Sequence, residues 1–171
     1  NSIVVELGSF FGRSSLYIAS LIKHGSKNLE LHCVDTWDYQ QRLGPGGSWD
    51  CQKRHATTYN LFLDNMKSYN DFCKDHQLDW KWNTGPFMPT SVDVVIISSC
   101  VEPALLPQTV NMWLPIVKNG GFIAGLDMML PQYPEGGLMI KRTQAMILLH
   151  RLFGDNVKSI DGYWYMPKGE S

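Results

Sequence analysis

The sequence predicts an α/β fold in which a mostly parallel sheet carries helices on both faces and ends in an antiparallel hairpin. Three observations lead to this prediction. Short apolar runs of the kind found in buried parallel strands alternate with longer segments of helical periodicity. The first such run ends at Leu7 and is followed directly by a glycine turn and a helix-like segment. Near the C-terminus, Asp161-Gly162 separates two short apolar runs, which is a hairpin signal.

Size and composition bound the class of protein. A chain of 171 residues is expected to form a single domain with a sizeable core. Its hydrophobic share of 44% and charged share of 18% are typical of globular proteins. The net charge of −1 gives no basic footprint, so we expect no nucleic-acid partner. No apolar run approaches the roughly 20 residues of a spanning helix, so we expect no membrane partner.

The four cysteines are widely spaced and form no C-x-x-C pair. They allow two disulfides or four reduced thiols. A domain of this size does not depend on disulfides, so we favour reduced thiols and a cytoplasmic location. The residues concerned are Cys33, Cys51, Cys73 and Cys100.

The expected elements follow from periodicity and turn signals. Residues 3–7 form the first strand, and a helix over 12–24 ends at Gly25. The second strand, 29–34, ends at Asp35. A glycine-rich loop follows, either as a flap over a ligand or as an exposed connection, and an aromatic stripe then predicts a helix over 54–76. The later elements are strands at 78–82, 92–98 and 122–125, helices at 104–118 and 138–153, and a hairpin of 157–160 with 163–166.

The glycine turn after the first strand is the first candidate for a binding site. Gly8 and Gly12 let the backbone approach a ligand closely, and the helix that follows offers free N–H groups. The spacing is neither G-x-G-x-x-G nor a Walker P-loop. Glu6 places a carboxylate beside this loop, which suits a ligand with positive charge. S-adenosylmethionine, with its ammonium and sulfonium groups, fits that description.

The end of the second strand supplies the other half of the candidate site. An acid there accepts hydrogen bonds from ribose hydroxyls in nucleotide-binding folds, so Asp35 has either that role or the role of a turn cap. Trp37 and Phe10 are candidates for aromatic contacts with an adenine or a sulfonium. Buried packing is the alternative for both rings.

Four stretches in order resemble class I S-adenosylmethionine-dependent methyltransferases, most closely methyltransferase family 24. They are ELGSFFGRSS at 6–15, VDTW at 34–37, FLDNM at 62–66, and WLP through KNGGFIAGLD at 113–127. The resemblance covers nearly the whole chain. It implies a Rossmann-like class I fold with S-adenosyl-L-methionine as the cofactor. The cofactor-binding residues it implies are Glu6, Gly8, Ser9, Phe10, Gly12, Ser14, Asp35, Thr36 and Trp37.

The chain departs from this family on the acceptor side. The family usually has an acid at the end of strand four, followed by Gly-x-His, where this chain has SSCVE at 98–102. After strand five the family usually reads Gly-His-Asp-Tyr, and this chain reads GLDM at 125–128. A metal needs several converging ligands, so we predict none. Asp127 is the best remaining candidate for a catalytic base, with a structural cap as the alternative.

Two functions follow. The first is methyl transfer to a small-molecule or sugar-like acceptor, with O-methylation expected, and it rests on the intact cofactor half. The second is a methyltransferase-like domain that has lost catalysis and acts as a binding or structural module. The chain begins at Asn1, whereas proteins of the resembling family usually have helices before the first strand. We therefore expect that such helices are missing or that the domain was excised from a longer chain, whose other domains are then expected partners.

Overall fold

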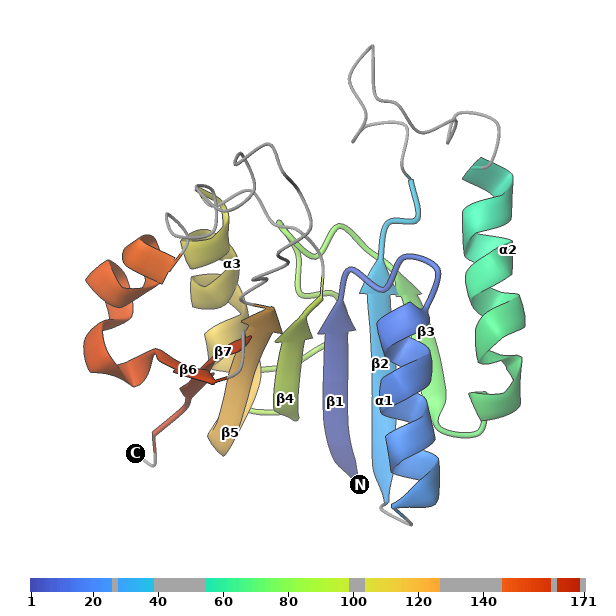
Figure 1. The fold of residues 1–171 in the computed structure, drawn as a ribbon, viewed down its shortest axis with the longest axis horizontal. Helices are drawn as coiled ribbons and strands as arrows, with labels where there is room; N and C mark the ends of the chain where they lie inside the picture. Colours follow the sequence, from blue (N-terminus) through green and yellow to red (C-terminus); the bar gives the residue numbers. More distant parts are fainter. Residues whose placement is uncertain (26–27, 39–54, 99–103, 127–145, 161–162, 170–171) are drawn as a thin grey trace.

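The computed structural model describes residues 1–25, 28–38, 55–98, 104–126, 146–160 and 163–169. Within these residues the chain forms a seven-stranded sheet with helices packed on it (Figure 1). The strands are β1 (Ser2–Leu7), β2 (Leu29–Asp35), β3 (Cys73–Gln77), β4 (Val92–Ile97), β5 (Val117–Leu126), β6 (Lys158–Ile160) and β7 (Tyr163–Pro167). The helices are α1 (Arg13–His24), α2 (His55–Met66) and α3 (Leu106–Trp113), with 3₁₀ turns η2 (Lys67–Tyr69), η3 (Leu114–Ile116) and η4 (Gly154–Asn156).

The strand order is β3-β2-β1-β4-β5-β7-β6. The first five strands in this order are parallel, and β7 and β6 add an antiparallel pair. The predicted fold class is therefore confirmed. The order reverses between β1 and β4, which makes the carboxyl ends of these strands the switch point where open α/β sheets bind ligands.

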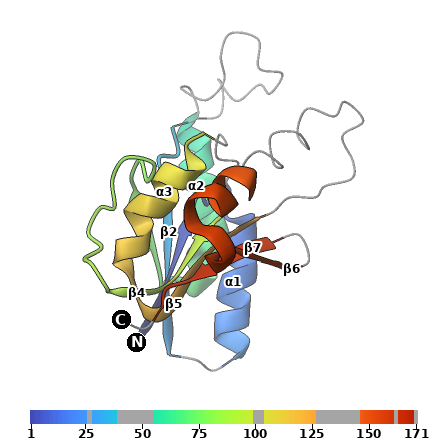
Figure 2. The same ribbon diagram turned by 90° about the vertical axis from the view of Figure 1, so that its left-hand side faces the viewer.

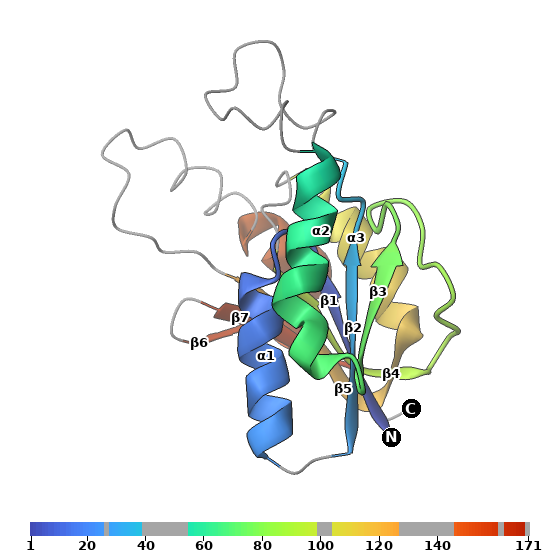
Figure 3. The same ribbon diagram turned by 90° about the vertical axis from the view of Figure 1, so that its right-hand side faces the viewer.

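Two apolar cores lie on opposite faces of the sheet. Helices α1 and α2 cover one face and α3 covers the other (Figures 2 and 3). Successive residues along β2 point to opposite faces of the sheet. Leu31 and Cys33 therefore belong to the core on the α1/α2 side, and Val34 belongs to the core on the α3 side. This two-sided burial explains the continuous apolar runs in β1 and β4.

The C-terminal hairpin was predicted correctly and closes one side of the sheet. Strand β7 pairs with β5, with Trp164 opposite Gly125. The Trp164 indole, 3% exposed, lies over Gly125 so closely that an added Cβ would be 2.6 Å from its ring. The glycine in β5 therefore makes room for the tryptophan of β7.

The predicted third strand was wrong. Strand β3 is Cys73–Gln77, and the predicted strand at 78–82 belongs to the loop that follows. The helix predicted over 54–76 was too long, because α2 ends at Met66 and a 3₁₀ turn and a further turn at 70–72 precede β3. The cause is that β3 lies at the edge of the sheet and consists mainly of polar side chains, so it lacks the apolar pattern of an interior strand.

Two of the predicted elements extend beyond the described residues. Of the loop predicted after Asp35, only residues 36–38 are described. Of the helix predicted over 138–153, residues 146–153 are described and are helical.

Candidate functional site

The glycine loop turns the chain sharply between β1 and α1. Gly8 (φ 90°) and Gly12 (φ 83°) both adopt left-handed backbone conformations that favour glycine. The Gly8 N–H donates to the Val34 carbonyl over 2.8 Å, which joins the loop to β2. Phe10, between the glycines, also has a positive φ of 50°. The loop thus has a specific tight conformation at the carboxyl end of β1 (Figure 1).

Glu6 is fully buried beneath this loop and accepts three hydrogen bonds from hydroxyl groups. Ser9 Oγ donates to Oε2 over 2.8 Å, Ser15 Oγ also donates to Oε2, and Ser98 Oγ donates to Oε1 over 2.8 Å. The carboxylate therefore ties together β1, the loop, α1 and the end of β4. Its position gives it a structural role, and its direct contact with a cofactor stays a prediction.

Asp35 connects the end of β2 to the glycine loop. Its side chain is fully buried. One carboxylate oxygen, Oδ2, accepts the Phe10 backbone N–H over 3.0 Å, and Oδ1 accepts the Trp37 backbone N–H over 3.0 Å. The Thr36 hydroxyl lies 3.5 Å from Oδ1 and accepts the Asp38 N–H over 3.2 Å. The structure therefore shows the capping role for Asp35, and ribose binding by this residue stays a prediction.

Trp37 bonds to the glycine loop and packs against α2. Its indole N–H donates to the Phe10 carbonyl over 2.7 Å, and the side chain is 4% exposed. Its ring packs against Phe62, at 4.7 Å between centroids, and against Tyr59, at 5.0 Å. The structure therefore shows the packing role for Trp37, and contact with a bound ligand stays a prediction. Phe10 lies against Phe11, with ring centroids 3.8 Å apart.

The structure brings most of the predicted cofactor-binding residues together. Those of the first motif occupy the end of β1, the loop and the start of α1, and those of the second motif occupy the last residue of β2 and the two residues after it. Both backbone polar groups of Phe10 link the two motifs, through Asp35 and Trp37. The first group is Glu6, Gly8, Ser9, Phe10, Gly12 and Ser14, and the second is Asp35, Thr36 and Trp37.

Two residues of this network escaped the sequence analysis. Ser15 and Ser98 both donate to the Glu6 carboxylate. A buried acid in an apolar strand needs hydrogen-bond partners, so serines at neighbouring strand and helix ends were the available signal. Asp127, the predicted base, lies outside the described residues.

The described cysteines are free thiols. Cys33 Sγ lies 3.7 Å from Cys73 Sγ, on the α1/α2 side of β2 and β3. The hydrogen bond with Cys73, together with burial, raises the pKa of Cys33 well above its usual value. These two agree with the expectation of reduced thiols, while Cys51 and Cys100 lie outside the described residues.

No cluster of three or more His, Cys, Asp or Glu side chains suited to a metal ion occurs among the described residues. None of the helices in the described part of the chain has the length and apolar character needed to cross a membrane.

Comparisons with known proteins agree with this geometry. The sequence model of the methyltransferase domain, methyltransferase family 24, matches residues 5–128. No curated protein sequence matches the chain. Among solved structures, a protein from Methanococcus maripaludis described as an S-adenosyl-L-methionine-dependent methyltransferase is similar, with 14% identity and a TM-score of 0.63. The match covers 99% of this chain and 78% of that protein.

Two further structures have the same fold. The O-methyltransferase NovP is 15% identical with a TM-score of 0.63, and the match covers 99% of this chain and 73% of NovP. The methyltransferase (CMeT) domain of the citrinin polyketide synthase is 16% identical with a TM-score of 0.66, and 99% of this chain spans 47% of that structure. At these identities the likeness concerns the fold, whereas the family match covers most of the sequence. The chain belongs to methyltransferase family 24, within the class I S-adenosylmethionine-dependent methyltransferases.

Proposed function

We propose that this chain binds S-adenosyl-L-methionine and transfers its methyl group to a small-molecule acceptor. The observation that supports this most is the meeting of the glycine loop with the Asp35 carboxylate. The two come from the carboxyl ends of β1 and β2, beside the point where the strand order reverses.

The residues present suit the chemical groups of this cofactor. The first turn of α1 presents backbone N–H groups and itself contains no acidic residue, so it is able to donate hydrogen bonds to a ligand carboxylate. At the end of β2, Asp35 supplies carboxylate oxygens that are able to accept hydrogen bonds from ribose hydroxyls. The two features lie at the same edge of the sheet, as one elongated ligand requires.

Access to Asp35 requires a local change. Its side chain is fully buried, and one of its oxygens accepts the Phe10 N–H. A ribose hydroxyl therefore reaches this carboxylate only when the loop around Phe10 shifts. The hydrogen bond between the Trp37 indole and the Phe10 carbonyl opposes that shift.

When bound, the cofactor supplies a methyl group on an activating sulfonium. The protein then has to hold the donor and acceptor in line and to keep water out. Alignment of this kind accounts for on the order of 7–11 kcal/mol of a barrier in favourable cases. A general base adds about 10²–10⁴-fold, and we assign this role to Asp127.

The first test is a calorimetric titration with S-adenosylmethionine and S-adenosylhomocysteine. We expect micromolar binding by the wild type and at least tenfold weaker binding by Asp35→Asn. The amide keeps the size of the side chain and one acceptor oxygen, but it loses the charge that favours hydroxyl donors.

Asp93→Asn is the matched control. Asp93 also accepts a backbone N–H, that of Ile3 over 2.7 Å, but it lies toward the amino end of β1, away from the candidate site. Its substitution should change stability without changing cofactor affinity. A folded wild type that binds neither ligand at 1 mM would overturn the proposal.

We propose O-methylation of a hydroxyl-bearing acceptor, small or sugar-like. The support is the family resemblance and the shared fold of NovP, which is an O-methyltransferase. The same fold also occurs in the similar domain of the citrinin polyketide synthase, so the fold does not fix the acceptor atom. Analysis of the methylated product must identify it. Labelled S-adenosylmethionine incubated with a panel of phenols, sugars, amines and activated carbon acids tests this assignment. Label found only on nitrogen or carbon would contradict it.

A second candidate is a binding module without catalysis, within a longer protein. It is favoured by Ser98, which stands where the family usually carries an acid and whose hydroxyl donates to Glu6. Tight cofactor binding without methyl transfer to any acceptor in the panel would support this candidate over the first.

A further inference from the structure

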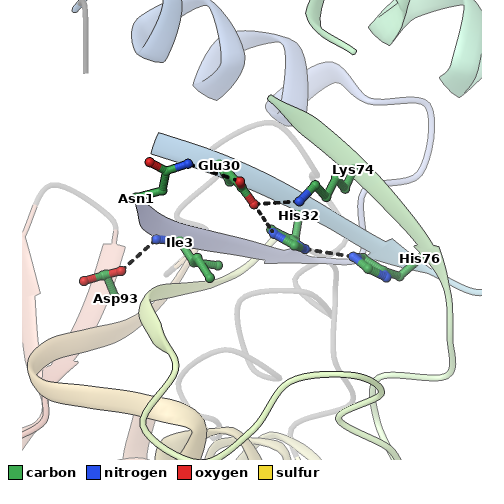
Figure 4. Close-up of polar contacts among 7 residues, drawn as sticks. All are labelled: Asn1, Ile3, Glu30, His32, Lys74, His76 and Asp93. Atoms are coloured by element: carbon green, nitrogen blue, oxygen red, sulfur yellow. Dashed lines mark hydrogen bonds and ion pairs between the residues drawn. The ribbon is translucent and has the colours of Figure 1, made fainter. Parts of the chain in front are cut away.

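A polar cluster lies on the face of β2 and β3 that is turned away from α1 and α2. It comprises Asn1, Glu30, His32, Lys74 and His76 (Figure 4). The candidate cofactor site uses none of these side chains. At its centre are His32 and His76, from neighbouring strands, which we call the imidazole pair.

The two rings of the imidazole pair are close together, nearly parallel and largely buried. His32 Nδ1 lies 2.8 Å from His76 Nε2, and the two ring planes are within 5° of parallel. The ring of Phe87 meets both imidazoles edge-on, at 5.3 Å between centroids in each case. His32 is 8% exposed. The pair is thus held between the sheet and the loop at 78–91 that carries Phe87.

The contacts fix where the protons lie at neutral pH. Glu30 Oε2 lies 3.4 Å from His32 Nε2, and an ionised carboxylate only accepts hydrogen bonds. His32 Nε2 therefore carries a proton and its Nδ1 is an acceptor. His76 Nε2–H then donates to His32 Nδ1, which gives a chain of two hydrogen bonds through neutral rings.

This pair of linked hydrogen bonds accommodates one additional proton and no more. When His32 gains a proton on Nδ1, the bond survives if the proton of His76 moves to its other ring nitrogen. When both rings are protonated, two N–H donors face each other across the short contact and two like charges share a covered site. The hydrogen bond between the strands is then lost.

Burial and the surrounding charges together oppose protonation of both rings. Burial is the main cause of the lowered pKa of His32, and His76 and Lys74 lower it further, while Glu30 opposes them. Burial also lowers the pKa of His76, with Asp75 opposing and Lys74 assisting. From the loop the pair meets Phe87, which is uncharged.

Glu30 keeps its charge in mildly acidic solution. Hydrogen bonds from Lys74 and Asn1 lower the pKa of Glu30 to about 2. On acidification the two imidazoles therefore gain protons, at a pH below their ordinary value, before Glu30 does.

The imidazole pair joins β2 to β3 at the edge of the sheet. Strand β3 is the last strand of its side of the sheet and pairs with β2 in the described residues. Just beyond β3, the Leu78 N–H donates to the Asp35 carbonyl over 2.9 Å. We propose that the imidazole pair is a proton-operated lock, which holds β3 and the loop at 78–91 onto β2 at neutral pH and releases them on mild acidification.

The sign of the effect on stability follows from linkage. A histidine whose folded-state pKa is lowered binds fewer protons in the folded state than in the unfolded state. Its favourable contribution is complete above the unfolded value of about 6.5 and is lost as pH falls through and below that value. The wild type should therefore become less stable between pH 7 and 5.

Proton NMR titration of the histidines of the wild type is the direct test. We expect the ring signals of His32 and His76 to titrate below their ordinary value of about 6.5 in two coupled steps. Independent titration of His32 and His76 at an ordinary value would overturn the proposal without any variant.

The variant His76→Gln tests the lock itself. Glutamine is able to donate to or accept from His32, but it takes up no proton. We expect it to remove at least half of the wild-type fall in Tm between pH 7 and 5, while the control His24→Gln leaves that fall unchanged. Hydrogen exchange, corrected for the intrinsic effect of pH, should show selective loss of protection at 73–91 in the acidic wild type and not in His76→Gln. An equal fall in Tm in both proteins, or protection at 73–91 that persists in acid, would overturn the lock.

The lock does not depend on the proposed function, although the link from Leu78 to Asp35 makes an effect on cofactor affinity expected. S-adenosylhomocysteine should bind the wild type at least fivefold more weakly at pH 5.5 than at pH 7.5, with a smaller change in His76→Gln. Absence of binding at pH 7.5 would count against the methyltransferase proposal alone, because the NMR and exchange measurements read the lock without any ligand.

Discussion

At the scale of single residues, Ser98 explains how the chain tolerates its departure from the family at the end of β4. Its hydroxyl donates to Glu6, whose other carboxylate oxygen already accepts from Ser9 and Ser15. A hydroxyl at position 98 thus satisfies a buried charge that a second acid would repel.

Restoring the acid should therefore be harmful in this chain. We expect Ser98→Asp to lower the free energy of unfolding by about 2–4 kcal/mol at pH 7, because Glu6 loses a donor and gains a like charge. The loss should be smaller at pH 4, where protonation of the introduced carboxylate removes the like charge. Denaturant titrations at both pH values measure it. Ser98→Asn is the control for side-chain size, and equal losses in the two variants would contradict the electrostatic explanation.

The candidate site shows what could be predicted from single residues. The acid at the end of β2 and the glycines after β1 were identifiable because their residue types carry a chemical or conformational requirement. The contact between Asp35 and the Phe10 N–H was not, because it depends on a positive φ at a phenylalanine, which no local pattern indicates. The role of Trp37 was also left open, because its indole donates to the backbone carbonyl of Phe10 and no side-chain type in the sequence indicates that partner.

At the scale of elements, the packing of the glycine loop against α2 rests on Gly12. A Cβ at this position would lie 3.1 Å from Phe62 Cδ2 and 3.5 Å from Met66 Sδ. Gly120 has a similar φ of 79° but faces open space. A comparison of alanine substitutions at the two positions therefore distinguishes the cost of backbone strain from the cost of crowding between the loop and α2.

Substitution of both glycines measures that contact. Gly120→Ala should cost about 1–2 kcal/mol, the strain of a left-handed alanine. Gly12→Ala should cost about 1 kcal/mol more, because the Phe62 ring must also shift. Urea unfolding of the two variants gives the difference. Equal costs would mean that the Phe62 ring of α2 moves aside without a loss of stability.

The elements themselves were predictable to different degrees. Strands β1, β2 and β4 stood out because apolar residues predominate in their sequences and most of these apolar residues are buried. Strand β3 was misplaced because His76, Lys74 and Asp75 give it the composition of a loop, and because Leu78, Trp80 and Trp82 next to it alternate like a strand. The apolar signal there comes from the loop: Trp80 is buried in the α3-side core, although Trp82 is 59% exposed. An edge strand held by polar side chains carries no periodic apolar signal.

At the scale of the whole molecule, the sheet joins a parallel ligand-binding part to an antiparallel end. Strand β5 belongs to both, because it pairs with β4 on one side and with β7 on the other. The α3-side core runs across this junction and includes Val95 from β4 and Trp164 from β7. That continuity supports the expectation of a single domain, which stays a prediction.

The junction at Gly125 tests whether the molecule unfolds as one unit. An added Cβ there would lie 2.6 Å from the Trp164 ring, so we expect Gly125→Ala to displace the indole and to cost about 1–3 kcal/mol. If the chain is one cooperative domain, unfolding followed by tryptophan fluorescence and by far-ultraviolet circular dichroism should shift together to lower denaturant concentration. Gly169→Ala, where a Cβ would meet open space, is the matched control and should leave both curves in place. Two separated transitions in Gly125→Ala would show instead that the C-terminal hairpin unfolds independently, and the parallel strands would then form the cooperative unit that carries the cofactor site.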